Sequence, residues 1–148
     1  MNIIKTLDQY NNDNIFFCEP IKNNIINEGV FIKIIYSTDF FVLNGIYLLI
    51  NLYNITCEKY YTKYKCHFDI STHKQLINKI KNIEEDILQK IKINKIPLYK
   101  INEQLQNGNI KIFNDVKYTD NTYFILKISG IWETQNNYGL TYKFIKID

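Results

Sequence analysis

Apolar residues recur with helical spacing between Ser71 and Lys92, and this is the clearest pattern of hydrophobic and polar positions in the chain. They form one stripe of seven aliphatic residues: Leu76, Ile77, Ile80, Ile83, Ile87, Leu88 and Ile91. Thr72 followed by Gln75 has the form of a capping box, which predicts the start of a helix. Exposure of seven aliphatic side chains to water is unfavourable, so we predict a helix over about Thr72 to Ile91 that packs on a sheet or on another helix. Leu76, Ile80, Ile83 and Ile87 are expected to be buried.

The segments on both sides of this helix have the composition of β-strands. Three strands are predicted before the helix, over Val30 to Tyr36, Phe40 to Tyr53 and Tyr60 to Ile70. Asn44-Gly45 in the second segment fits a hairpin turn or a bulge, and the density of Ile, Leu and Tyr after Gly45 favours one long bent strand. The strands predicted after the helix are Ile110 to Phe113, Tyr123 to Trp132 and Leu140 to Ile147.

This order of elements predicts a mainly β fold with one long helix. Five strands with a helix between the third and fourth fit an oligonucleotide-binding (OB) fold, a Greek-key barrel, here with an extra C-terminal hairpin strand. The alternative is another α+β sheet with a helix packed on one face. At 148 residues the chain is expected to form a single OB-like domain over residues 1–148, with residues 1–14 as a loosely ordered N-terminal segment.

The composition is that of an ordinary globular domain, with 46% hydrophobic and 22% charged residues. All 18 basic residues are lysine, and Ile, Lys and Asn are abundant. AT-rich codons favour these three residues, so the lysine excess is explained equally well by a genomic bias and by function. The net charge of +3 is compatible with a nucleic-acid partner but does not require one.

The three cysteines do not form a recognisable framework. Because the N-terminal residues lack the apolar core of a signal peptide, we expect an intracellular protein with reduced thiols and no internal disulfide, not a secreted one. Cys57, Cys66, His67 and His73 have the spacing C-x8-C-H-x5-H, which matches no closed zinc site. No metal, other cofactor or membrane span is expected. No catalytic motif is present, so we do not expect an enzyme.

One strand alternates aromatic and basic residues in the way that a single-stranded nucleic acid would need. Because Tyr60 to Ile70 alternates as a strand does, Tyr61, Lys63, Lys65 and His67 share its polar face, joined by Lys59. Aromatic rings stack on bases and lysines contact phosphates. A solvated strand face in a lysine-rich protein explains the pattern equally well.

A second candidate group follows the helix. Tyr123 and Lys127 share one face of their predicted strand, with Lys143 nearby, whereas Trp132 falls on the other face and is expected in the core. In an OB barrel the ligand crosses the second and third strands. That placement would add Tyr47, Lys111 and Lys117 to the predicted nucleic-acid-binding residues.

The run LKISGIWETQNNYGLTYKF, from Leu126 to Phe144, resembles the C-terminal hairpin of a family of single-stranded DNA-binding proteins. The family occurs in nucleocytoplasmic large DNA viruses of the mimivirus-like and phycodnavirus-like groups. Its fold is similar to the single-stranded DNA-binding protein of short-tailed coliphages, an OB barrel. The segments FIKIIYSTDFFVLNGIYLLI and HKQLINKIKNIEEDIL resemble its central part. The phage proteins end in an acidic tail, whereas this chain ends in FIKID, so recruitment of partners through a tail is not implied.

The resemblance implies binding of single-stranded DNA without strong sequence preference, in viral DNA replication, recombination or repair. The expected location is the replication compartment of an infected host cell, or the virion. RNA as a ligand, a homo-oligomer, and viral replication or virion proteins as partners stay open. The alternative function is that of a structural or interaction protein, such as a minor virion component, because 12 tyrosines suit a protein interface equally well.

Overall fold

The computed structural model describes residues 3–23, 29–113 and 123–147. Its two α-helices are α1 (Lys74–Lys90) and α2 (Lys100–Gln106). Short 3₁₀ turns are η1 (Leu7–Gln9), η2 (Asn12–Asn14) and η3 (Ser71–His73). The strands before α1 are β1 (Ile15–Phe17), β2 (Ile21–Asn23), β3 (Gly29–Ser37), β4 (Val42–Leu43), β5 (Ile46–Asn51), β6 (Thr56–Tyr60) and β7 (Lys63–His67). The strands after it are β8 (Ile96–Leu98), β9 (Asn109–Ile112), β10 (Tyr123–Glu133) and β11 (Asn137–Lys146).

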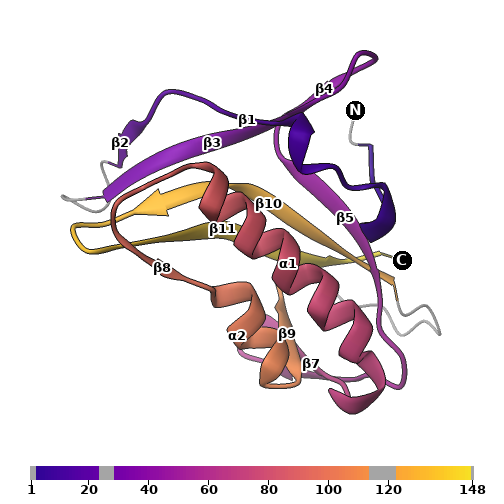
Figure 1. Cartoon of the computed structure of the whole chain (residues 1–148). Helices are drawn as coiled ribbons and strands as arrows, with labels where there is room; N and C mark the ends of the chain where they lie inside the picture. The colour runs from indigo at the N-terminus through magenta and orange to yellow at the C-terminus, as the bar shows by residue number, and fades with distance from the viewer. Residues whose placement is uncertain (1–2, 24–28, 114–122, 148) are drawn as a thin grey trace.

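The long hairpin of β10 and β11 is the centre of the sheet (Figure 1). One side of β10 pairs first with β5 and then, beyond an irregularity between Ile128 and Gly130, with β3. The other side of β10 pairs with β11, and β11 in turn pairs in parallel with β8 and β9. Beyond β9, the sheet continues with β7, which pairs with β9, and with β6, which pairs with β7. The resulting order is β1-β3-β10-β11-β9-β7-β6, and β1 and β6 lie at opposite ends of an open, mixed sheet.

The structure confirms a mainly β fold with one long helix, but the described strands do not close into the predicted five-stranded barrel. Seven described strands, not three, precede α1. The predicted strand from Phe40 to Tyr53 is two strands, because the chain turns at Gly45, whose φ is +110°. This backbone conformation is readily adopted by glycine. The turn lets β4 pair with β3 while β5 pairs with β10.

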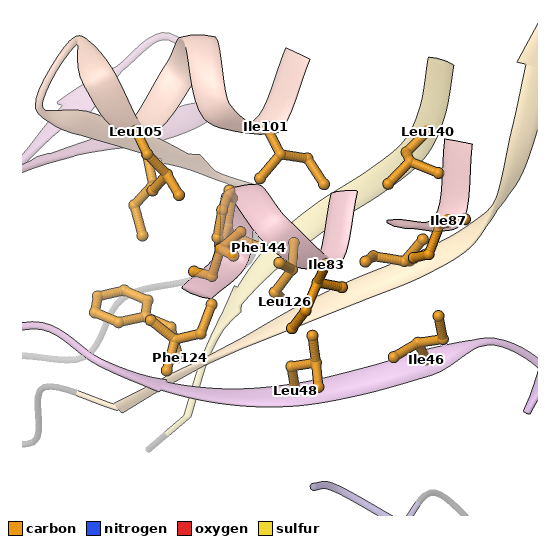
Figure 2. Close-up of a cluster of buried hydrophobic side chains, with 14 of the residues drawn as sticks. Ile46, Leu48, Ile83, Ile87, Ile101, Leu105, Phe124, Leu126, Leu140 and Phe144 are labelled. Atoms are coloured by element: carbon orange, nitrogen blue, oxygen red, sulfur yellow. The ribbon is translucent and has the colours of Figure 1, made fainter. Parts of the chain in front are cut away.

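Helix α1 covers one face of the central strands, and its apolar stripe forms the core with β5, β10 and β11 (Figures 1 and 2). Ile80, Ile83 and Ile87 are buried as predicted, whereas Leu76 is only partly buried near the start of the helix. The predicted capping box does not form. The Thr72 hydroxyl donates to the Asp69 carbonyl oxygen instead, and the turn η3 leads into α1.

A carboxylate on α1 holds the second helix in place. Glu84 is only 1% exposed, and its two oxygens accept hydrogen bonds from the backbone N–H groups of Ile101 and Asn102, at 3.0 and 2.9 Å. These N–H groups belong to the first turn of α2, where a helix has no internal acceptors. Burial raises the pKa of the Glu84 carboxyl group, and the two hydrogen bonds oppose that shift. Glu84 therefore acts as the N-terminal cap of α2 from a neighbouring element.

Replacement of Glu84 by alanine is expected to lower the free energy of unfolding by about 2–4 kcal/mol, because two N–H groups lose their acceptor. The same change at Glu85, a neighbour that makes neither bond, should cost less than about 0.5 kcal/mol.

The stability of the domain should also depend on the protonation of Glu84. Because the pKa of Glu84 is raised in the folded state, proton binding to Glu84 contributes fully to the free energy of unfolding at a pH below the ordinary pKa of 4.5. This contribution is lost as the pH rises through the folded-state pKa. Urea unfolding of the parent and Glu84→Gln over a pH series measures the loss, and parallel pH profiles would contradict it.

Candidate nucleic-acid interface

The predicted strand from Tyr60 to Ile70 is interrupted by a turn. Tyr60 ends β6, a tight turn at Tyr61 and Thr62 follows, and β7 begins at Lys63, so β6 and β7 form a hairpin; Tyr61 has a φ of +57°. Positive φ is uncommon for a bulky residue such as tyrosine. Turns of this kind are usually marked by Gly, Asn or Asp, and the sequence has none of these residues here. The turn breaks the alternation on which the prediction depended. Tyr61 is therefore an exposed turn residue and not a member of the strand face.

The hairpin also places Lys59 on the opposite face from the one predicted. Directly paired residues share a face, and Lys59 pairs with Tyr64 while Cys57 pairs with Cys66. Cys57 and Cys66 form a disulfide across the hairpin, so the expectation of no internal disulfide is wrong. The two cysteines are nine residues apart in the sequence, and the turn between β6 and β7 brings their Cα atoms to within 4.0 Å of each other. Cys18 is a free cysteine.

The other face of the hairpin continues onto β9. Lys65 pairs with Glu58 on one side and with Lys111 on the other, and Lys63 pairs with Tyr60. His67 is placed in the same way between Thr56 and Asn109. We call this surface the hairpin face and define it by seven residues: Glu58, Tyr60, Lys63, Lys65, His67, Lys111 and Phe113.

The hairpin face combines cations with exposed rings. Tyr60 is 62% and Phe113 60% exposed, and the Lys63 ammonium lies 5.1 Å from the centre of the Phe113 ring. Among the described residues of this face, Glu58 is the one carboxylate, and it contacts His67 Nε2 at 3.0 Å. A hollow of about 360 Å³ lies between Tyr60, Lys63, Lys65 and Lys111.

A second hollow, the α2 cleft, adjoins the hairpin face. It has a volume of about 420 Å³ and lies between α2 and strands β9 and β11. These strands pair at one described register position, Ile112 with Phe144, and space for a cleft remains beside it. Lys111 lines both hollows, so the two are neighbours on the surface. Lys100 and Lys143 bring two further cations to the cleft.

A tyrosine orients a side-chain amide in the α2 cleft. The Tyr142 hydroxyl donates to Gln104 Oε1 at 2.7 Å. Burial, together with the charges of Glu84 and Glu103, raises the pKa of Tyr142 to about 12, so the hydroxyl keeps its proton at neutral pH. Because the amide oxygen is engaged by this bond, the NH₂ group of Gln104 is the end that remains to donate to a ligand.

Lys127, Tyr47 and Tyr123, three further predicted residues, lie on the same side of the sheet as the hairpin face, further along it. Lys127 pairs with Tyr47 on β5 and with Lys143 on β11, and its ammonium lies 5.5 Å from the centre of the Tyr47 ring. Tyr47 itself is buried, and Tyr123 is exposed at the start of β10. Lys117 lies outside the described residues.

The structure therefore brings together Lys63, Lys65, His67 and Lys111 from the sequence prediction, and it adds Tyr60, Phe113 and Lys100, which sequence reasoning missed. Phe113 follows Lys111 by two residues, so strand alternation alone could have placed it on the same face. Lys100 had no such signal, because its position depends on how α2 packs against the sheet.

The four residues considered as zinc ligands make other contacts in the structure, and His67 lies beside Glu58. Cys57 and Cys66 are joined to each other, and His73 is buried between the rings of Tyr53 and Phe68. His73 Nε2 accepts a hydrogen bond from the Tyr53 N–H at 2.8 Å, and Nδ1 lies 2.6 Å from the Asp69 carbonyl oxygen. This arrangement requires a neutral ring with its proton on Nδ1.

Comparisons with models of known protein families, with curated proteins and with solved structures found no match. Within residues 3–23, 29–113 and 123–147, no helix is long and apolar enough to span a membrane.

Proposed function

We propose that the protein binds single-stranded nucleic acid, with DNA as the main ligand, through the hairpin face and without strong sequence preference. The observation that carries the proposal is the cross-strand grouping of Lys63, Lys65 and Lys111 with the exposed rings of Tyr60 and Phe113. Lysines attract phosphates, and rings stack on bases of any sequence. A role in viral DNA replication, recombination or repair belongs to the same proposal and follows from the resemblance of the sequence.

The proposal includes a relation to OB folds, which can be partly open Greek-key barrels. Two features support it. Strand β10 exchanges one neighbour, β5, for another, β3, along its length, and α1 packs against the central strands. The ligand would then lie on the sheet face opposite α1.

The exposed rings of the hairpin face favour a flexible single strand over a duplex. The exposed rings of Tyr60 and Phe113 can stack on a base only when that base is unpaired and turned outward. A lysine ammonium contacts a phosphate as a point charge and reads no base edge. Together they predict tight binding to oligo-dT and weaker binding to a duplex of the same length.

Titration of a fluorescent oligo-dT with the purified protein at several salt concentrations tests the proposal. The logarithm of the binding constant should fall linearly with the logarithm of the salt concentration, with a slope of about −0.7 for each phosphate contact. The three lysines of the face predict a slope of about −2. Absence of binding to oligo-dT at low salt would contradict the proposed function.

A different surface favours the second candidate function, that of an interaction protein. Phe16, Ile21 and Val42 lie exposed on β1, β2 and β4, which all pair with β3, and Phe40 is 94% exposed between β3 and β4. Exposed apolar residues gathered on neighbouring strands are typical of protein contacts. Binding through such a surface would change little with salt, in contrast to binding through the hairpin face.

A further inference from the structure

We infer that the α2 cleft is a binding site for one nucleotide, which holds a base and its phosphate beside the hairpin face. This inference rests on the proposed function, since the nucleotide would be part of the strand that lies on that face. The cleft volume of about 420 Å³ falls in the range of small-molecule sites, which is about 300–1,000 Å³.

The phosphate would be held by lysines from three different elements. Lys100 comes from α2, Lys111 from β9 and Lys143 from β11, and all three line the cleft. Lys111 and Lys143 are exposed, so they can turn toward an anion. The carboxylate that lines the cleft, Glu103, lies 3.7 Å from the Lys100 ammonium and offsets part of the charge of that lysine. The cleft therefore keeps an excess of positive charge.

The base would be held by a ring and an amide. Phe113 lines the cleft and is exposed, and its ring centre lies 5.1 Å from the ammonium of Lys63, which lines the neighbouring hollow. Gln104, with its oxygen engaged by Tyr142, can donate from its NH₂ group to a ring nitrogen or carbonyl oxygen of the base. Every nucleobase carries such an acceptor, so the site would tolerate all bases, in agreement with a lack of sequence preference.

The path of the strand follows from this placement. Because Lys111 lines both hollows, a strand that contacts Lys63 and Lys65 would reach the neighbouring α2 cleft by passing Lys111. The cleft would then hold the nucleotide at one end of the contacted segment. The nucleotide site and the hairpin face can be tested separately, because Lys65 lines only the hollow of the hairpin face and Lys143 lines only the cleft.

The test uses thymidine monophosphate and oligo-dT as ligands of the whole chain, with NMR spectra of the ¹⁵N-labelled protein. Thymidine monophosphate should bind weakly and shift the side-chain NH₂ signals of Gln104. Lys143→Gln should weaken binding of both ligands several-fold. Lys65→Gln should weaken oligo-dT binding and leave thymidine monophosphate binding unchanged. Lys81→Gln, at an exposed position on α1, removes the same charge and should affect neither ligand.

The failure of the inference differs from the failure of the proposed function. If oligo-dT binds and thymidine monophosphate causes no shifts at the cleft, or if Lys143→Gln binds both ligands like the parent, the nucleotide site is wrong and the hairpin face stands. If thymidine monophosphate binds at Gln104 and oligo-dT does not bind, the site is supported and the proposed function is wrong. A spectrum identical to that of the parent for Lys143→Gln without ligand would show that the variant is folded.

Discussion

Replacement of both Lys63 and Lys65 by glutamate is expected to reduce the affinity for oligo-dT by on the order of 100-fold at low salt. The change removes two phosphate contacts from the centre of the hairpin face and adds two repelling charges beside Lys111. The slope of the salt dependence should become shallower by about 1.4, which is 0.7 for each lost contact. Fluorescence anisotropy at several salt concentrations measures both quantities.

The matched control is the pair Lys74→Glu and Lys81→Glu, which changes the net charge equally at exposed positions of α1. This variant should lose only the small part of the affinity for oligo-dT that depends on the overall charge of the protein.

Tyr60→Ala separates the contribution of stacking to the affinity from that of electrostatics. It should weaken binding by about 1–3 kcal/mol and leave the salt slope nearly unchanged. If the double glutamate variant is folded and binds like the parent, the nucleic acid does not lie on the hairpin face.

Replacement of Ile83 by aspartate is expected to unfold the domain. Ile83 is 6% exposed and lies in the core among residues of α1, β5 and β10 (Figure 2). Loss of the buried side chain costs about 2–5 kcal/mol, and a buried charge adds several more. This sum is comparable with the whole stability of a typical domain, about 5–15 kcal/mol. Circular dichroism during heating should show no cooperative transition.

Ile83→Val is the control for this position, because it keeps the apolar character and should cost only about 0.5–1.5 kcal/mol. Lys81→Asp introduces the same aspartate two residues earlier, at an exposed position on α1. It should retain the cooperative transition. A folded Ile83→Asp protein with a melting temperature near that of the parent would mean that α1 does not pack on the sheet as described.

The site could be predicted only in part, and the reason lies in the turn at Tyr61 and Thr62. Residues Lys63, Lys65 and His67 were placed on one face because alternation holds within β7 whatever precedes it. Lys59 was misplaced because alternation does not continue across a turn. Neither turn residue is Gly, Asn, Asp or Pro, so local preferences offered no warning. The disulfide of Cys57 and Cys66 was missed for the same reason.

The sequence by itself determined the helix and most of the strands, because their periods of 3.6 and two residues depend on neighbours along the chain. The buried positions Ile80, Ile83 and Ile87 followed from that periodicity. Only the tertiary structure decided which strands are neighbours, and therefore that the sheet is open and that β9 joins β7 to β11. Strand pairing and helix docking depend on contacts between residues far apart in the chain, for which local periodicity carries no information. The α2 cleft depends on such contacts, because it is lined by Lys100, Lys111 and Lys143 from three different elements. The cap that Glu84 provides for α2 depends on them as well.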